Sequence, residues 1–122
     1  MPSAEYAPGQ IIVLDWRGDG LPREANKHRP CVVVEDTALF DSGYPNVIVV
    51  PLAESADFVV EALSVEIGPT AENGCTKTCY AMGHAVVTAS KKRISKVTSS
   101  RITAEQLRAI RTCIAESVGL DR

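Results

Sequence analysis

Short runs of Val and Ile, separated by turn residues, fill the first two thirds of this chain and constrain its fold more than any other feature. Such runs are typical of an all-β unit, because β-branched side chains favour extended backbone and Gly, Pro, Asn and Asp favour turns. We therefore expect several short strands. In chain order they are Ile11–Trp16, Cys31–Glu35, Val47–Leu52, Ser64–Ile67 and one strand through Tyr80–Thr88.

The C-terminal segment has a different pattern, which predicts a single helix. Thr103 followed by Gln106 fits a capping box, and Ile102 and Leu107 flank that cap as a hydrophobic staple would. The apolar residues then follow helical spacing up to a Gly that can end the helix, namely Leu107, Ile110, Ile114, Val118 and Gly119. The 122 residues fit one domain, a mainly β barrel closed by a C-terminal helix.

Charge is unevenly distributed along the chain. Residues 1–90 contain twelve of the fifteen acidic residues but five of the thirteen Lys and Arg residues. The strip from Lys91 to Arg101 contains five basic residues and no acidic one. Such a strip indicates binding to a polyanion, although a solvated face whose Lys stems cover apolar surface gives the same pattern.

Cysteines and hydropathy bear on metal binding and location. Cys31 and Cys113 fall in apolar patterns typical of buried free thiols, and the three-residue gap between Cys75 and Cys79 departs from the usual metal or redox spacing. We expect reduced thiols, no metal site and no cofactor.

The apolar runs are far shorter than the roughly 20 residues of a membrane span, and residues 1–5 lack the features of a secretion signal. These observations predict a cytoplasmic protein without a membrane partner.

The segment Arg17–Pro30 is long for a connection between strands, and long loops often carry function. It ends in Lys27-His28-Arg29-Pro30, immediately before a predicted strand. An arginine at the edge of a sheet can face a phosphate in a fixed geometry, because its planar guanidinium makes paired hydrogen bonds and keeps its charge. The alternative is an exposed charge at the end of a loop.

The order of these motifs resembles the MazF/PemK family of toxins from prokaryotic toxin–antitoxin pairs. That family has a Gly-x-Ile-Val start, an Arg-Pro-x-x-Val-Val strand and a Val-x-Pro-Leu strand end, followed by a terminal helix. The matching segments here are Gly9–Trp16, His28–Val34, Val47–Leu52, Glu72-Asn73-Gly74, the Ser90–Ile94 turn and the C-terminal helix. The resemblance implies a small SH3-like barrel of the CcdB/PemK type, a homodimer, and a cognate antitoxin that covers an RNA groove.

The resemblance also implies an activity, metal-independent cleavage of single-stranded RNA. In this chemistry the ribose 2′-hydroxyl attacks the adjacent phosphorus, so the protein must supply a base, an acid and positive charge. Arg29 matches the family's catalytic arginine, and Glu24 matches an acidic position seen in some members and could act as the base. His28 is a further candidate, since the ordinary pKa of histidine lies near neutrality, or it is a loop histidine that packs or binds phosphate.

Two positions depart from the family pattern. Ala53 stands directly after Pro51-Leu52, where the family has an active-site Thr, and Tyr80-Ala81 stands near the position of the usual Asp-Gln pair. If the strand continues, Ser55 falls on the same face as Ala53, about 7 Å along, and is the candidate substitute.

Two functions therefore remain open. The first is an endoribonuclease, and the second is a member of the same fold that binds nucleic acid, an antitoxin or a protein target without cleaving RNA, as CcdB-type relatives do. Trp16 beside the long loop could stack on a base, or it is a core residue. The complete set of expected RNA-binding residues is Asp15, Trp16, Arg17, Lys27, Lys77, Lys91, Lys92 and Arg93.

Overall fold

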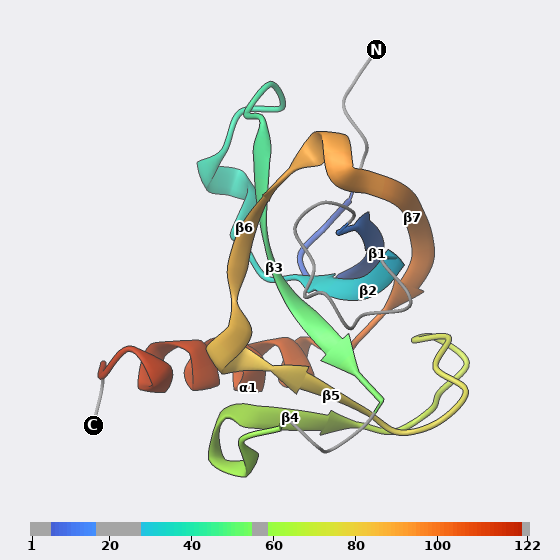
Figure 1. Ribbon diagram of the computed structural model, residues 1–122, viewed down its shortest axis with the longest axis vertical. Coiled ribbons are helices and arrows are strands. Elements are labelled where there is room, and N and C mark those ends of the chain that lie inside the picture. The colour runs from blue at the N-terminus through green and yellow to red at the C-terminus, as the bar shows by residue number, and fades with distance from the viewer. Residues whose placement is uncertain (1–5, 17–27, 55–58, 121–122) are drawn as a thin grey trace.

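A computed structural model of the chain describes residues 6–16, 28–54 and 59–120. These residues form a mainly antiparallel β-structure with one C-terminal helix (Figure 1). The strands are β1 (Gln10–Asp15), β2 (His28–Val33), β3 (Asn46–Ala53), β4 (Ser64–Ile67), β5 (Cys79–Met82), β6 (Val87–Ser90) and β7 (Ile94–Arg101), and the helix is α1 (Ala104–Ser117). Short 3-10 turns lie at η1 (Thr37–Leu39), η2 (Glu61–Leu63), η3 (Gly83–Ala85) and η4 (Lys91–Arg93).

The strands pair in the order β4-β5-β3-β2-β1-β7, and β6 pairs separately with β3. β3 is the strand on which the sheet turns. Its first part pairs with β6 from Asn46 to Val49, and its last two residues, Leu52 and Ala53, pair with β5. Because one strand serves two neighbours on the same side, the sheet curves around β3, as the long diagonal strand of Figure 1 shows.

Alternate residues of the central strands enter two separate apolar cores, as the two-residue repeat of a strand requires. Val32, Val50 and Leu52 belong to the helix-side core, which also contains Ile110 of α1. Cys31, Val33 and Val49 belong to the second core, which also contains Ile12 and Leu14 of β1. The central strands are therefore apolar on both faces, which explains their continuous Val and Ile runs.

The predicted strands agree with the structure over most of this region. The first and third strands lie within one residue of the predicted bounds, and Ser64–Ile67 is a strand as predicted. β2 begins at His28 rather than at Cys31, because the backbone of residues 28–30 already pairs with Val13–Asp15 of β1.

Two parts of the sequence fold differently from the prediction. The single strand predicted through Tyr80–Thr88 is wrong, because η3 divides it into β5 and β6. Gly83 of η3 lies so close to α1 that a Cβ atom there would be 2.7 Å from Cβ of Cys113. The basic strip was not predicted to be a strand, yet its second part forms β7, which pairs with β1. Many side chains of β7 are exposed, which is why the strand can be mostly polar.

The helix begins and ends at the predicted residues. Thr103 Oγ1 accepts from the Gln106 backbone N–H at 3.0 Å, and Gln106 Oε1 accepts from the Thr103 N–H at 2.9 Å. Ile102 and Leu107 both lie in the helix-side core, and Gly119 follows the helix with a φ of 85°. Among the described residues no helix is both long and apolar enough to cross a membrane.

Replacing Thr103 by alanine is expected to lower the free energy of unfolding by about 1 kcal/mol, because the first turn of α1 loses its cap. Urea denaturation followed by circular dichroism measures the change. Thr112→Ala is the matched control; Thr112 is exposed on the same helix, and alanine there is expected to change stability by no more than a few tenths of a kcal/mol. Equal losses in the two variants would contradict the capping role.

Candidate functional site

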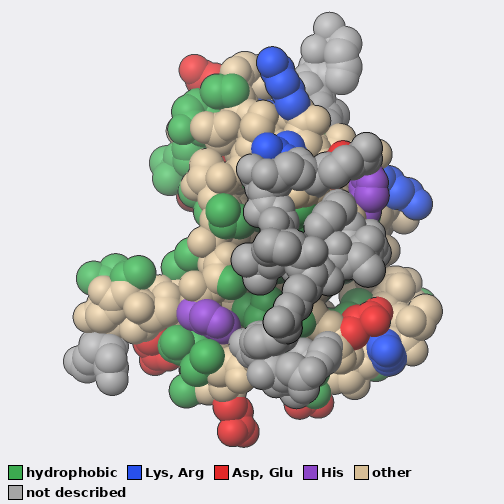
Figure 2. Space-filling view, viewed as in Figure 1, with side chains coloured by type: hydrophobic (Ala, Val, Ile, Leu, Met, Phe, Trp, Pro, Cys, Tyr) green, Lys and Arg blue, Asp and Glu red, His purple; other side chains and the backbone are tan. Residues whose placement is uncertain are grey.

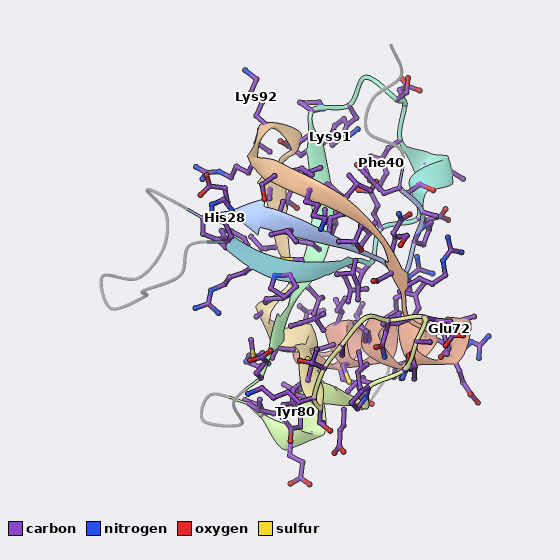
Figure 3. The ribbon with its side chains drawn as sticks, turned by 90° about the vertical axis from the view of Figure 1, so that its right-hand side faces the viewer. His28, Phe40, Glu72, Tyr80, Lys91 and Lys92 are labelled. Atoms are coloured by element: carbon purple, nitrogen blue, oxygen red, sulfur yellow. The ribbon has the colours of Figure 1, made fainter. Side chains whose placement is uncertain are left out.

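The end of β1 and the starts of β2 and β7 come together at one corner of the sheet. Asp15 lies opposite His28, and Leu14 lies opposite both Arg29 on β2 and Ile94 on β7. β1 pairs with both strands and therefore brings His28 and Arg29, at the start of β2, to the same corner as the basic turn at residues 91–93, which precedes β7. Figure 3 shows His28 at this corner, near the end of β1.

Arg29 is half-buried at this corner, and its Nε atom is shielded from solvent. Its charge acts on Cys31, the next residue on the same face of β2. Burial raises the pKa of the Cys31 thiol to about 12, and the positive charge of Arg29 opposes that rise. A guanidinium held partly out of water interacts with a phosphate more strongly than a fully solvated one does.

His28 and Arg93 are joined to the neighbouring strand ends by hydrogen bonds. His28 Nδ1 lies 3.3 Å from Ser95 Oγ, and Ser95 Oγ in turn donates to the Val13 carbonyl at 3.2 Å. Arg93 Nη1 donates to the Asp15 carbonyl at 3.2 Å. Arg29, His28 and Arg93 therefore concentrate basic groups around one corner whose strand ends are tied together.

Ala53 is the last residue of β3, where that strand leaves β2. β2 and β3 pair at Cys31–Pro51, Val32–Val50 and Val33–Val49, so Arg29 and Ala53 both lie beyond the end of this ladder. Here β3 leaves β2, and Ala53 pairs instead with Tyr80 of β5. Alanine supplies no hydroxyl at this position, and its partner on β5 is the half-buried Tyr80.

Ser95 is a polar neighbour of this corner that did not enter the sequence interpretation. No local pattern marks it, since it reaches His28 through pairing between strands that are far apart in the sequence. Tyr80, a departure from the family pattern, lies on β5, well away from His28 (Figure 3).

The remaining predicted RNA-binding residues are distributed over a wider surface. Lys91 turns away from the corner, with Nζ 3.5 Å from the Ser42 carbonyl and 5.8 Å from the centre of the Tyr6 ring. Lys92 is exposed at the outer end of the η4 turn (Figure 3). Lys77 pairs with Glu54 at 3.4 Å, beside the end of β3. Trp16 is half-buried against the second core, which favours a packing role over base stacking.

Figure 2 shows how charge is distributed on the face that carries this corner. Lys and Arg side chains gather over its upper half and right edge, near a histidine, and most of its acidic side chains lie toward the lower edge.

Four predicted site residues lie outside the described residues, namely Arg17, Glu24, Lys27 and Ser55. Their roles stay predictions from the sequence.

The cysteines lie outside this corner, except for Cys31. All four are free thiols, with Cys31, Cys79 and Cys113 buried. Burial, and then a hydrogen bond with the neighbouring Cys75 thiol, raise the pKa of Cys79 to about 11, and burial also raises the pKa of Cys113. The described part of the chain contains no group of three His, Cys, Asp or Glu side chains placed to share a metal ion.

Solved structures share this architecture. An endoribonuclease in complex with its cognate antitoxin, from Mycobacterial species, is 20% identical with a TM-score of 0.72, covering 97% of this chain and 99% of that one. MazF from Deinococcus radiodurans is 14% identical with a TM-score of 0.73, covering 97% and 100%. The Mycobacterium tuberculosis toxin MazF-mt6 is 18% identical with a TM-score of 0.69, covering 93% and 99%. The chain therefore has the MazF-like fold, and the predicted fold class is confirmed.

The sequence assigns the chain to a family within that fold. Residues 7–118 match the sequence model of the PemK-like, MazF-like toxins of type II toxin-antitoxin systems. No curated protein matches the chain. The protein belongs to the PemK/MazF-like toxin family, as the resemblance of its motifs predicted.

Proposed function

We propose that this protein is the toxin of a type II toxin–antitoxin pair and cleaves single-stranded RNA as a metal-independent endoribonuclease. The observation that carries the proposal is the position of Arg29. Arg29 follows His28 on β2, at the corner where β1 pairs with β2 and β7, and its half-buried side chain has Nε shielded from solvent. Family membership and the fold of relatives that are endoribonucleases support the same activity.

The proposed reaction needs a base, an acid and a cation, and each has a candidate. His28 or Glu24 takes the proton of the 2′-hydroxyl, whose oxygen then bonds to the adjacent phosphorus. The bond from phosphorus to the 5′-oxygen breaks, and that oxygen receives a proton, for which Arg29 is the candidate donor. Arg29 also offsets the negative charge that gathers on the phosphorane oxygens. The products are a 2′,3′-cyclic phosphate and a 5′-hydroxyl.

The proposed partners are single-stranded RNA, a cognate antitoxin and a second copy of the chain. Solved structures of relatives include an endoribonuclease in complex with its cognate antitoxin from Mycobacterial species and MazE-MazF from Deinococcus radiodurans. An antitoxin that covers the basic corner would block access of RNA to Arg29. Arg93 and Lys92 lie beside that corner and are suited to contact the RNA backbone.

A non-cleaving function is the second candidate, and Ala53 is the observation that favours it. Ala53 stands at the end of β3, directly after Pro51-Leu52, where the family pattern has a hydroxyl side chain that this chain lacks. A chain with this substitution could bind RNA, an antitoxin or another protein without cleaving RNA. We favour cleavage because the arginine, which supplies the charge the reaction needs most, is present and held in place.

The test is incubation of the purified, antitoxin-free chain with a long single-stranded RNA in EDTA. We expect cleavage that persists in EDTA and leaves 5′-hydroxyl ends, detected by labelling with polynucleotide kinase without prior phosphatase treatment. Ala53→Thr is tested beside the wild type and is expected to retain or increase the rate, since it restores the hydroxyl that the family pattern has after Pro51-Leu52. Folding of both proteins is checked by circular dichroism.

The two candidate functions predict different results. Cleavage by the wild-type chain supports the nuclease and shows that a hydroxyl at position 53 is not required. Intact RNA with a folded wild-type protein overturns the nuclease proposal. If Ala53→Thr alone then cleaves RNA, the chain is a binding member of the family whose lost activity is explained by that residue.

A further inference from the structure

Ser95 stands between the backbone of β1 and the imidazole of His28. Its Oγ lies 3.2 Å from the Val13 carbonyl oxygen and 3.3 Å from His28 Nδ1. β2 and β7 both pair with β1 on opposite sides, so this side-chain contact links two strands that flank a common neighbour. The contact is exposed, at the same corner as Arg29.

The two contacts bear on which ring nitrogen carries the proton. A serine hydroxyl has one hydrogen to donate, and a carbonyl oxygen can only accept. With Ser95 Oγ donating to the Val13 carbonyl, the contact with His28 favours the tautomer whose proton is on Nδ1. In a neutral imidazole with a proton on Nδ1, Nε2 carries the lone pair and is the nitrogen that can accept a proton.

We propose that Ser95 is a positioning residue that holds His28 in the tautomer in which Nε2 acts as the base. This inference rests on the proposed function, because it assigns the proton acceptor of that reaction. Nε2 takes the proton of the RNA 2′-hydroxyl, O2′ forms its bond to phosphorus, and the 5′-oxygen leaves with a proton from the acid. Without Ser95 the Nδ1–H loses this acceptor, and a ring that carries its proton on Nε2 cannot act as a base through that atom.

The same arrangement explains how a loop-end histidine keeps one orientation. Asp15 and His28 are paired in the ladder, which fixes the backbone of His28 relative to β1. Val13 and Lys96 are paired on the other side of β1, which fixes the backbone next to Ser95. Both ends of the hydrogen bond are therefore attached to one strand, and the side-chain contact adds the orientation of the ring.

The first measurement is the tautomer of His28, read from ¹⁵N chemical shifts of the imidazole in the full chain. The sequence contains two histidines, so His84→Gln leaves the signals of His28 alone. We expect the Nδ1-protonated form in the wild-type background and in Ser95→Thr, which keeps the hydroxyl. Ser95→Ala is expected to shift the neutral ring toward the Nε2-protonated form that free histidine prefers. Ser99→Ala, another exposed serine of β7, is the matched control and is expected to cause no change.

The second measurement is the cleavage rate under single-turnover conditions. Ser95→Ala is expected to lower the rate constant at saturating RNA by about tenfold, which is part of the roughly 10²–10⁴-fold that a positioned base contributes. The RNA concentration at half-saturation is expected to stay nearly unchanged. Ser95→Thr is expected to restore most of the rate. A purely structural role would not move the tautomer and would not be rescued in this way.

The outcomes separate this inference from the proposed function. An Nε2-protonated His28 in the wild type, or a tautomer unaffected by Ser95→Ala, overturns the positioning role whether or not RNA is cleaved. A tautomer that shifts in Ser95→Ala while a cleaving chain keeps its full rate overturns the role of Nε2 as base. If the wild type does not cleave RNA at all, the proposed function fails and the catalytic assignment fails with it.

Discussion

Replacing Arg29 by alanine is expected to lower kcat/KM for RNA cleavage by about 100- to 1,000-fold, the usual cost of removing a group that stabilises charge in a transition state. Arg29 is half-buried, and its Nε is shielded from solvent at the corner where β1 pairs with β2 and β7. Water cannot replace it, since a solvent molecule brings no positive charge to the phosphorane. The rate is measured with a fluorogenic single-stranded RNA in EDTA.

Two further variants show whether the effect belongs to the guanidinium. Arg29→Lys keeps the charge but loses the planar fork, so an intermediate rate is expected. Arg108→Ala removes the same side chain from an exposed position on α1, away from the corner, and is expected to cleave like the wild type. A folded Arg29→Ala variant that retains wild-type kcat/KM would remove Arg29 from the mechanism.

The second large effect is expected on stability, at the contact between η3 and α1. Gly83→Ala is expected to lower the free energy of unfolding by about 2–3 kcal/mol, since the added methyl group overpacks a buried contact. Its Cβ would lie 2.7 Å from Cβ of Cys113, 3.1 Å from the Leu63 carbonyl oxygen and 3.2 Å from the Ile114 backbone N. Two of these atoms are backbone, so the clash can be relieved only by moving α1 or the end of η2.

Gly68→Ala is the matched control, because a Cβ at that exposed glycine meets no atom within 4 Å. Its expected effect on the free energy of unfolding is less than about 0.5 kcal/mol. Urea denaturation of the three proteins by circular dichroism measures both values. Gly83→Ala with wild-type stability would show that α1 shifts on the sheet at little cost, and that the closeness of η3 to the helix does not constrain the fold.

The sequence by itself determined the elements whose signal is local. The capping box at Thr103 and the apolar spacing up to Val118 defined α1, because helix capping and amphipathic spacing act over a few residues. The Val and Ile runs defined β1 and β3, since a strand covered on both faces is apolar throughout. The order of the motifs also indicated the family to which the chain belongs.

The sequence did not predict the elements whose conformation depends on a distant neighbour. β5 and β6 are interrupted at η3, where Gly83 meets Cys113 on α1, about thirty residues further along the chain. β7 is a strand despite its polar composition, because the backbone of β1 offers it hydrogen-bonding partners. Neither contact leaves a pattern in the local sequence.

The candidate site divides in the same way. Arg29 and His28 could be selected from the sequence, because a basic pair directly before an apolar strand has a recognisable local chemistry. Only the tertiary structure placed Ser95 beside His28 and Ala53 beside Tyr80 of β5. The physical reason is that strand register is set by hydrogen bonds and packing between segments far apart in the chain, and a shift of one residue would turn each side chain to the other face of the sheet.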